Sequence, residues 1–203
     1  MFTGIVSELG TVVAATPGGE GATFTVAAPQ TTVDLAVGDS IAVNGVCLTA
    51  VAAGDGAFTV EAVAETLQRT NLGDLTEASV VDLERPVAAA GGRFDGHVVQ
   101  GHVDGVGTIR AIESEGTSKR MRINAPASLA RYLVEKGSVT VDGVSLTITA
   151  VSAIADEDPW FEIVLIPHTL DVTVLGVRTV GDGVNLEVDI LAKYVERLME
   201  ARG

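Results

Sequence analysis

The sequence has one cysteine, Cys47, and few aromatic residues, which make up 4% of the chain. A single cysteine can form neither an intrachain disulfide nor an all-cysteine metal site, and it fits a reducing compartment. Basic residues are also scarce, since 13 Lys and Arg stand against 27 Asp and Glu and give a formal net charge of −14. Nucleic-acid binding relies on clustered Lys and Arg, so we expect no nucleic-acid partner.

Long apolar runs are missing as well. Val, Ala, Ile and Leu occur in short stretches interrupted by 23 glycines, and no stretch reaches the ~20 residues that a membrane span needs. Residues 1–10 have neither the basic start nor the apolar stretch of a secretory signal. The sequence therefore predicts a globular protein of the cytoplasm, with no membrane segment.

The sequence does contain an internal repeat. Residues 40–49, SIAVNGVCLT, recur as residues 138–147, SVTVDGVSLT, at a shift of 98 positions (138 − 40). Three further pairs of segments match in the same order: 65–73 with 168–176, 4–6 with 101–103, and 81–84 with 184–187. Chance matches would not stay collinear, so the repeat predicts two related domains, over residues 1–86 and 87–188.

Each half has the pattern of short β-strands. The expected strands are β-branched or alternating in polarity and are bounded by Gly, Asp or Pro; they include residues 23–27, 57–60, 80–84, 121–123 and 161–166. About six short strands in a half of this size close most economically as a barrel. The sequence thus predicts an all-β fold with two tandem six-stranded barrels related by internal duplication.

Two segments have helical spacing instead. Residues 126–135 place apolar side chains at i, i+3 and i+4 and predict a short helix that stops before Gly137. Residues 189–203 predict a C-terminal α-helix with Asp189 as its N-cap and an apolar stripe from Ile190 to Met199. The pattern leaves open whether this stripe packs on its own barrel or forms a subunit interface.

Two of the three histidines lie in residues 96–105, GHVVQGHVDG. In a regular strand, residues five apart face opposite sides, so His97 and His102 could not share a metal ion without a bulge, and we predict no metal site. His102 is a candidate general acid or base, because imidazole titrates near neutral pH. Its repeat counterpart is Ile5, and this difference between the copies indicates a division of labour.

Cys47 and Ser145 are repeat counterparts, and each precedes Leu-Thr. The period of two in a strand places Cys47 on the same face as Thr49, and Ser145 on the same face as Thr147. A thiol and hydroxyls on one face suit the wall of a site for a hydrogen-bonding heterocycle. No G-x-G-x-x-G or Walker motif is present, so we expect neither a dinucleotide nor a P-loop site.

Together these motifs resemble the riboflavin synthase family over essentially the whole chain. The landmarks are residues 1–6, 44–49, 65–67, 70–73, 96–97, 100–105, 136–138, 142–147, 166–169 and 193–197. Each is short, but together they are highly specific. The sequence departs from the usual pattern at Asp82, where Asn is common, and at Asp95, where Gly is common, and His168 is one of several residues that the family tolerates.

The resemblance implies two Greek-key barrels and a C-terminal helix that holds a homotrimer. It also implies a dismutation without metal or redox cofactor, in which a four-carbon unit passes between two molecules of 6,7-dimethyl-8-ribityllumazine. The products are riboflavin and 5-amino-6-ribitylamino-2,4-pyrimidinedione, in the last step of riboflavin biosynthesis. Each barrel would bind one lumazine, and the active site would lie between barrels of neighbouring subunits. Lumazine synthase is a further partner implied by the resemblance.

The resemblance also implies the site residues, by matched position. The N-terminal barrel site would use Gly4, Ile5, Val6, Ser40, Cys47, Leu48, Thr49, Glu61, Ala62, Val63, Ala64, Glu65, Thr66, Gly101, His102 and Val103. The C-terminal barrel site would use Lys136, Ser145, Leu146, Thr147, Val164, Leu165, Ile166, Pro167, His168 and Thr169.

Five of the matched residues are expected to be catalytic. His102 would transfer protons, Ser145 and Thr147 would polarise the donor ring, Cys47 would contact the acceptor ring, and Phe2 would close the N-terminal barrel site. The alternative function is that of a non-catalytic lumazine- or flavin-binding chromophore protein with the same fold. Such proteins lose active-site residues, whereas all five are present here.

Overall fold

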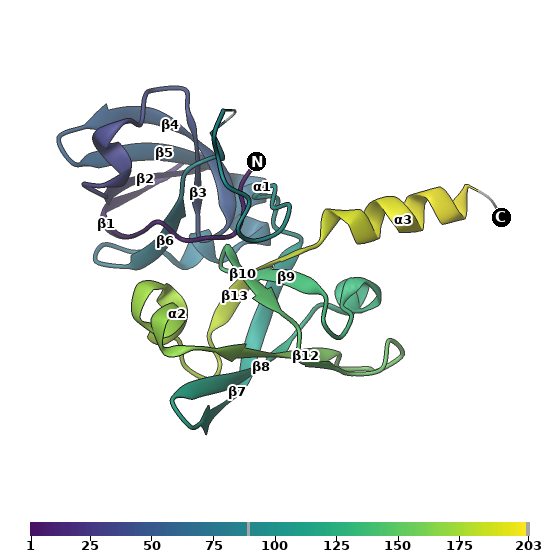
Figure 1. Ribbon diagram of the computed structural model, residues 1–203. Coiled ribbons are helices and arrows are strands. Elements are labelled where there is room, and N and C mark those ends of the chain that lie inside the picture. The colour runs from purple at the N-terminus through teal and green to yellow at the C-terminus, as the bar shows by residue number, and fades with distance from the viewer. Residues whose placement is uncertain (89, 202–203) are drawn as a thin grey trace.

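The computed structural model describes residues 1–88 and 90–201, and it shows two β-barrels, one above the other, with a helix that projects to one side (Figure 1). The first barrel contains β1 (Glu8–Gly18), β2 (Gly21–Ala27), β3 (Ser40–Val43), β4 (Val46–Gly54), β5 (Ala57–Val63) and β6 (Val80–Glu84). The barrel closes in the order β1-β2-β5-β4-β3-β6. Hairpins link β3, β4 and β5, and β2 lies beside β5, which is the Greek-key arrangement.

The second barrel repeats this arrangement. It contains β7 (Gly105–Glu115), β8 (Ser118–Asn124), β9 (Ser138–Val141), β10 (Val144–Thr147), β11 (Ala150–Val151), β12 (Trp160–Leu165) and β13 (Gly183–Val188). The order β10-β9-β13-β7-β8-β12-β11 is the circular order of the first barrel, with β10 and β11 in the place of β4. The second barrel is thus an open sheet of seven strands, where six were predicted, because the strand equivalent to β4 is interrupted between β10 and β11. The break falls at Ile148 and Thr149, where the Thr149 N–H donates to the Glu162 carbonyl at 2.8 Å.

The prediction of two duplicated barrels is confirmed, and the duplication extends to local irregularities. The register of β1 shifts between Val12 and Ala14, and that of β7 shifts between Ile109 and Ala111, 97 residues later (109 − 12). Such bulges bend a long strand and increase its twist, so that it can wrap around a small barrel. Alternate side chains along the strands fill two separate apolar cores, one per barrel. The connection between β6 and β7 contains the domain boundary that we propose after residue 86.

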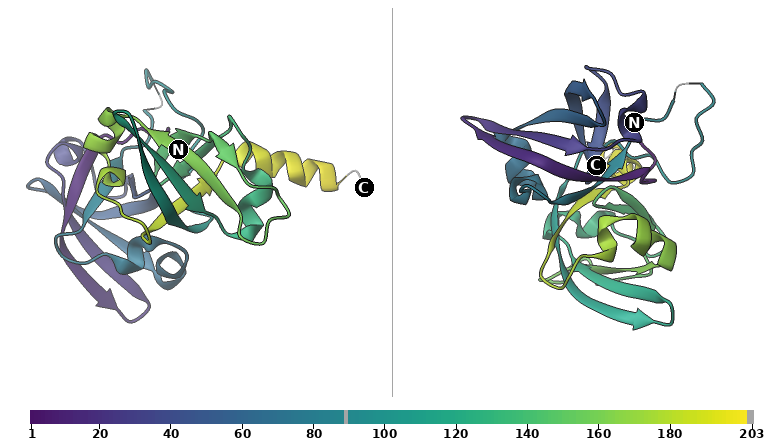
Figure 2. Two further views of the ribbon diagram at one scale, coloured as in Figure 1. Left: turned by 90° about the horizontal axis from the view of Figure 1, so that it is seen from below. Right: turned by 90° about the vertical axis from the view of Figure 1, so that its left-hand side faces the viewer.

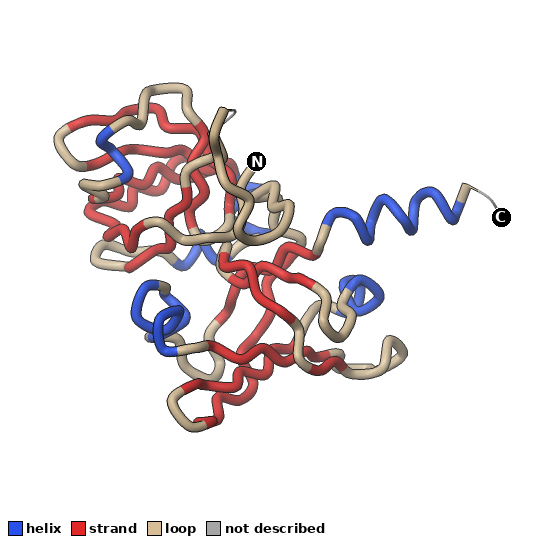
Figure 3. The backbone as a smooth tube through the Cα atoms, in the orientation of Figure 1, coloured by secondary structure: helices blue, strands red, loops and turns tan. Residues whose placement is uncertain are grey.

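Short helices connect the strands and lie in corresponding places in the two halves (Figure 3). They are η1 (Thr31–Val33), α1 (Ala64–Arg69), η2 (Asn71–Asp74), η3 (Ala127–Tyr132), α2 (Pro167–Val172) and η4 (Val174–Gly176). The helix predicted over 126–135 is the shorter 3-10 helix η3. It ends early because Leu133 turns to an extended conformation, with its N–H donating to the Ala130 carbonyl.

The last helix, α3 (Ile190–Glu200), begins where it is predicted, and the Asp189 carboxylate caps it by accepting the Leu191 N–H at 3.0 Å. The left view of Figure 2 shows that α3 projects from the body of the molecule. Its apolar side chains are consequently exposed, as Leu191, Tyr194 and Leu198 illustrate at 58%, 58% and 68%. Among the described residues, no helix is long and apolar enough to cross a bilayer.

The barrels meet through the turns of two equivalent hairpins. The turn of Asn44 and Gly45 faces the turn of Asp142 and Gly143, and all four residues have positive φ. A Cβ on Gly45 would lie 2.6 Å from the Gly143 nitrogen, and a Cβ on Gly143 would lie 2.7 Å from the Gly45 nitrogen. Glycine is therefore required in both turns, and the contact places the two halves about a local pseudo-twofold axis.

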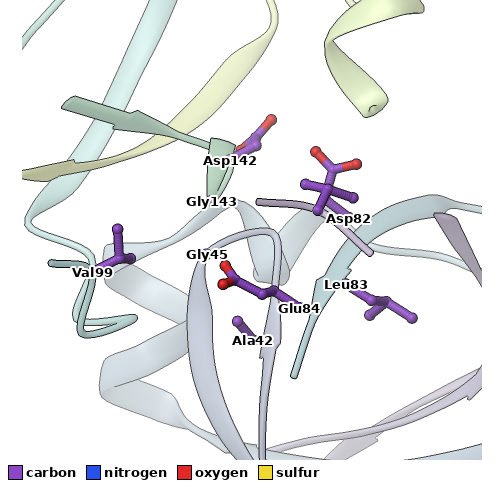
Figure 4. A pocket seen from close by; sticks show the side chains of 9 residues that line it. Ala42, Gly45, Asp82, Leu83, Glu84, Val99, Asp142 and Gly143 are labelled. Atoms are coloured by element: carbon purple, nitrogen blue, oxygen red, sulfur yellow. The ribbon is translucent and has the colours of Figure 1, made fainter. Parts of the chain in front are cut away.

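Buried polar side chains surround these turns and line a small cavity between the barrels (Figure 4). The Asn185 amide donates to the Asn44 carbonyl and to the Asn71 side chain, both at 2.8 Å. The Asn71 amide donates in turn to the Asp142 carboxylate at 2.8 Å. Burial raises the pKa of Asp142, and its ion pair with Arg178 opposes that effect. The interface is thus specified by hydrogen bonds as well as by shape.

Candidate active site

The segment that opens each half packs against the other barrel. The Ser145 N–H donates to the Gly4 carbonyl at 2.7 Å, and the Cys47 N–H donates to the Gly101 carbonyl at 2.8 Å. A Cβ on Gly4 would lie 2.6 Å from the Ser145 Cβ, and a Cβ on Gly101 would lie 2.7 Å from the Cys47 Cβ. Each candidate wall therefore combines a strand of one half with a segment of the other.

This exchange differs from the arrangement predicted by matched position, which sets Gly4, Ile5 and Val6 beside the first barrel. The structure packs Val6 against the core of the second barrel, and Val103 against the core of the first. Each segment reaches the other barrel because the two segments cross, and at the crossing Phe2 and Val99 form an antiparallel bridge. Sequence matching pairs the segments with each other, but it does not say which barrel each one touches.

A buried carboxylate holds the first crossing segment. Glu84, at the end of β6, accepts hydrogen bonds from the Thr3 N–H at 2.6 Å, the Thr3 hydroxyl at 2.8 Å and the Gly4 N–H at 2.9 Å. Burial raises the pKa of this carboxyl, and the donated hydrogen bonds lower it in part. Glu84 thereby fixes the backbone that faces Ser145.

Its repeat counterpart, Glu187, holds the second segment in the same way. It accepts the N–H groups of Gln100 at 2.7 Å, Gly101 at 2.9 Å and His102 at 2.9 Å. Burial again raises the carboxyl pKa against the hydrogen bonds. The two glutamates were not among the predicted site residues, although the match of 81–84 with 184–187 includes both.

His97 is the functional candidate that the sequence reasoning missed. Its Nδ1 lies 2.7 Å from the Ser145 hydroxyl oxygen. Burial lowers the pKa of His97, and the charge of Asp189 opposes that effect. A neutral imidazole in contact with a serine hydroxyl is the arrangement of a general base and the group that it activates.

The argument against a metal ion shared by His97 and His102 assumed a regular strand, and residues 97–104 do not form one. Apart from the bridge at Val99, this segment is irregular, and β7 begins only at Gly105. The alternation argument therefore does not apply. In the described part of the chain, no group of three His, Cys, Asp or Glu side chains is placed to hold a metal ion.

The polar wall residues face outward from the barrels. In β4, Val46 and Leu48 are buried, whereas Cys47 is partly exposed and Thr49 is exposed. In β10, Ser145 is partly exposed and Thr147 is exposed. The candidate sites consequently lie on the outer surfaces of the barrels and not in their cores.

Two candidate catalytic residues lie in contrasting places. Phe2 is fully buried and packs with Ala42, Val99 and Cys47, so its ring supports the strand behind Cys47 and has no free surface to close a site. The His102 side chain is exposed, while its backbone is held by Glu187.

The other predicted wall residues belong to strands and connecting segments of the two barrels. Ser40 begins β3, residues 61–66 join β5 to α1, residues 164–169 join β12 to α2, and Lys136 is exposed in the loop before β9. Three members point inward: the Leu48, Ala62 and Leu165 side chains are buried in the cores. Only the backbone of these three residues is available to a ligand.

Comparison with known proteins agrees with this architecture. The family model described as the lumazine binding domain matches residues 3–86 and again residues 100–189. The chain is 53% identical to a riboflavin synthase of Mycobacterium bovis over 100% of both chains. It is 44% identical to a riboflavin synthase of Bacillus subtilis, over 98% of this chain and 90% of that protein.

Solved structures show the same fold at low sequence identity. A crystal structure of LumP complexed with riboflavin superposes with a TM-score of 0.83 at 23% identity, over 93% of this chain and 99% of that chain. LumP complexed with 6,7-dimethyl-8-(1'-D-ribityl) lumazine gives a TM-score of 0.80 at the same identity and coverage. With the duplicated family model and the identities over the full chain, these findings show that the chain belongs to the riboflavin synthase family, with two lumazine binding domains.

Proposed function

We propose that this protein is a riboflavin synthase that converts two molecules of 6,7-dimethyl-8-ribityllumazine into riboflavin and 5-amino-6-ribitylamino-2,4-pyrimidinedione. The observation that carries the proposal is the equivalence of the two outward walls, in which Cys47 faces Gly101 and Ser145 faces Gly4. A reaction between two identical substrates suits a protein with two equivalent sites. The walls nevertheless differ in their polar groups, as a donor and an acceptor of the four-carbon unit require.

The first chemical requirement is a base for the 7-methyl group of the donor lumazine. Loss of a proton there gives an anion that delocalises into the heterocycle, and the partly buried pair of His97 and Ser145 suits this step. Ser145 loses its hydroxyl proton to His97 as it takes the methyl proton, so one proton moves along the pair. Thr147, exposed on the same strand face, would donate a hydrogen bond to the ring.

The second requirement is a polar wall for the acceptor lumazine. Cys47 and His102 supply it in the first barrel, where Glu187 fixes the backbone of His102. The four-carbon unit leaves one ring and joins the other, so the donor becomes the pyrimidinedione and the acceptor becomes riboflavin. No external oxidant is needed, because one lumazine is oxidised as the other is reduced. Two rings held in register also lower the entropic part of the barrier.

The assembly that we propose is a homotrimer in the cytoplasm, with each active site between the first barrel of one subunit and the second barrel of a neighbour. Helix α3 supports this assembly, because bonds to its own barrel occupy its polar face and leave its apolar face exposed. Arg131 donates to Glu196 at 2.6 Å, and Lys193 forms an ion pair with Asp104. Copies of α3 would cover one another's apolar faces. We also propose lumazine synthase as a partner.

Turnover by the purified protein tests the proposal. The protein is mixed with 6,7-dimethyl-8-ribityllumazine, without added cofactor, and the absorbance of riboflavin is followed. Formation of many riboflavin molecules per chain would support a synthase. Tight binding without turnover would instead identify a chromophore protein and would overturn the proposed roles of His97 and His102.

A further inference from the structure

Asp104 joins the segment that contains His102 to the C-terminal helix. One carboxylate oxygen accepts the Val188 N–H at 3.0 Å, and the other accepts a hydrogen bond from Lys193 of α3. The Asp104 side chain is 14% exposed and that of Lys193 is 32% exposed. The pair is therefore partly shielded from water, two residues along the chain from His102.

The first half provides an internal control for this contact. Ser7 is the counterpart of Asp104 (7 + 97 = 104), and their N–H groups make equivalent bonds to the Leu83 and Leu186 carbonyls, both at 2.8 Å. The Ser7 hydroxyl bonds only to the same Leu83 carbonyl, at 3.0 Å. Strand pairing thus needs no carboxylate at this position. Asp104 and its partner Lys193 belong to the second copy of the repeat, which also has His102 where the first copy has Ile5.

Helix α3 has a second, separate attachment to its barrel. Glu196 accepts hydrogen bonds from Arg131 at 2.6 Å and from the Tyr132 hydroxyl. Both donors belong to η3, and these two hydrogen bonds involve no residue of the crossing segments. A partly exposed ion pair such as that of Lys193 adds little to global stability. The Lys193–Asp104 pair differs from other surface ion pairs because Asp104 lies two residues from His102.

We infer that Lys193 is a positioning residue, which links the placement of α3 to the placement of His102. This inference rests on the proposed function. With α3 fixed in the assembly, Lys193 fixes the Asp104 carboxylate, while Glu187 fixes the N–H groups of residues 100–102. The segment is then held at both ends, and the exposed His102 imidazole is presented at one place. Loss of the pair would misplace His102 without removing a group that touches substrate.

Three variants of the full chain test this role. Lys193→Met removes the charge but keeps the bulk, Lys193→Arg keeps the charge, and Arg131→Gln weakens the other attachment of α3. We expect Lys193→Met to lower kcat about tenfold, because small displacements of a catalytic group are costly. KM for the lumazine should change less than about twofold, Lys193→Arg should restore most of kcat, and Arg131→Gln should keep the wild-type kcat.

Amide hydrogen exchange and sedimentation, measured on the same variants, separate positioning from assembly. Lys193→Met should accelerate exchange at residues 99–104 while the oligomeric state stays that of the wild type. Unchanged exchange and unchanged kcat would overturn the inference, and so would equal losses in Lys193→Met and Arg131→Gln or dissociation of the assembly by Lys193→Met. An inactive wild type would contradict the proposed function instead, and the exchange data would still show whether Lys193 orders the segment.

Discussion

The Gly4 carbonyl accepts a hydrogen bond from the Ser145 N–H at 2.7 Å, so the first half of the chain builds part of the wall on the second barrel. The reciprocal bond from Cys47 to Gly101 builds the wall on the first. Neither barrel forms its candidate wall alone. In the proposed mechanism the two domains must therefore hold a fixed relative position, and we expect the crossing segments to be sensitive to small changes.

Replacement of Gly4 by alanine tests this sensitivity. The new Cβ would lie 2.6 Å from the Ser145 Cβ, at a backbone φ of +79°. We expect Gly4→Ala to destabilise the protein by about 1–3 kcal/mol and to lower turnover more than tenfold. Urea unfolding and steady-state kinetics measure the two effects.

Gly38→Ala is the matched control, because Gly38 has a φ of +93° and open space around its Cβ position. It should share the backbone strain and leave turnover unchanged. Equal loss of activity in Gly4→Ala and Gly38→Ala would show that the contact with Ser145 is unimportant.

The pair of His97 and Ser145 predicts a pH dependence. Burial lowers the pKa of His97 below its ordinary value of 6.5, so the folded protein resists protonation there. The stability that neutral His97 contributes is fully present above the pKa that His97 has in the unfolded chain. It is lost as the pH falls through the lower pKa of His97 in the folded protein. The acid limb of the kcat profile should likewise lie below pH 6.5.

Variants of the pair test the assignment of this limb. His97→Gln should remove it and lower kcat about a hundredfold. Because the two groups act as a unit, His97→Gln combined with Ser145→Ala should be little worse than either alone. Additive losses, or an acid limb that persists without His97, would argue against a shared proton step.

Asp82 predicts a stabilising substitution. One of its carboxylate oxygens is buried without a partner, and burial raises its pKa. Its counterpart Asn185 donates its amide to the Asn44 carbonyl, so in Asp82→Asn the new amide would face the Asp142 carbonyl. We expect a gain of about 1–3 kcal/mol at pH 8.

The sign of the pH effect follows from the raised pKa. A group with a raised folded pKa contributes stability below its unfolded pKa, near 3.8 for Asp82, and loses it as pH rises through the folded pKa. The advantage of Asp82→Asn should therefore shrink as pH falls toward about 4. Urea unfolding from pH 4 to pH 8 measures it, and a variant less stable than the wild type at pH 8 would refute the account of this interface.

Mixed assemblies test the proposed location of the active site. His102→Gln impairs the first-barrel wall and Ser145→Ala impairs the second, so each variant alone should be nearly inactive. Trimers reassembled from equal amounts should regain about a quarter of the wild-type activity, because about one site in four then pairs two intact walls from different subunits. If each site belonged to a single chain, mixing would restore nothing.

Several of these features could be predicted from the sequence, and others could not. The barrels follow from the repeat and from the alternation within strands, and the capped helix α3 follows from Asp189 and the apolar spacing, because these signals are local. The contact of His97 with Ser145 joins residues 48 positions apart and depends on how the segments cross. The roles of Glu84 and Glu187 could not be predicted for the same reason. Both have the sequence pattern of ordinary strand residues, and the N–H groups that they accept are distant in the sequence.

The substrate balance of the reaction tests the central claim most directly. The protein is incubated with 6,7-dimethyl-8-ribityllumazine without oxygen or added cofactor, and all pyrimidine and flavin products are quantified by chromatography. A dismutation between two bound lumazines predicts the loss of two lumazines for each riboflavin and each 5-amino-6-ribitylamino-2,4-pyrimidinedione formed. Riboflavin formed without an equal amount of the pyrimidinedione, or only when an oxidant is supplied, would contradict it.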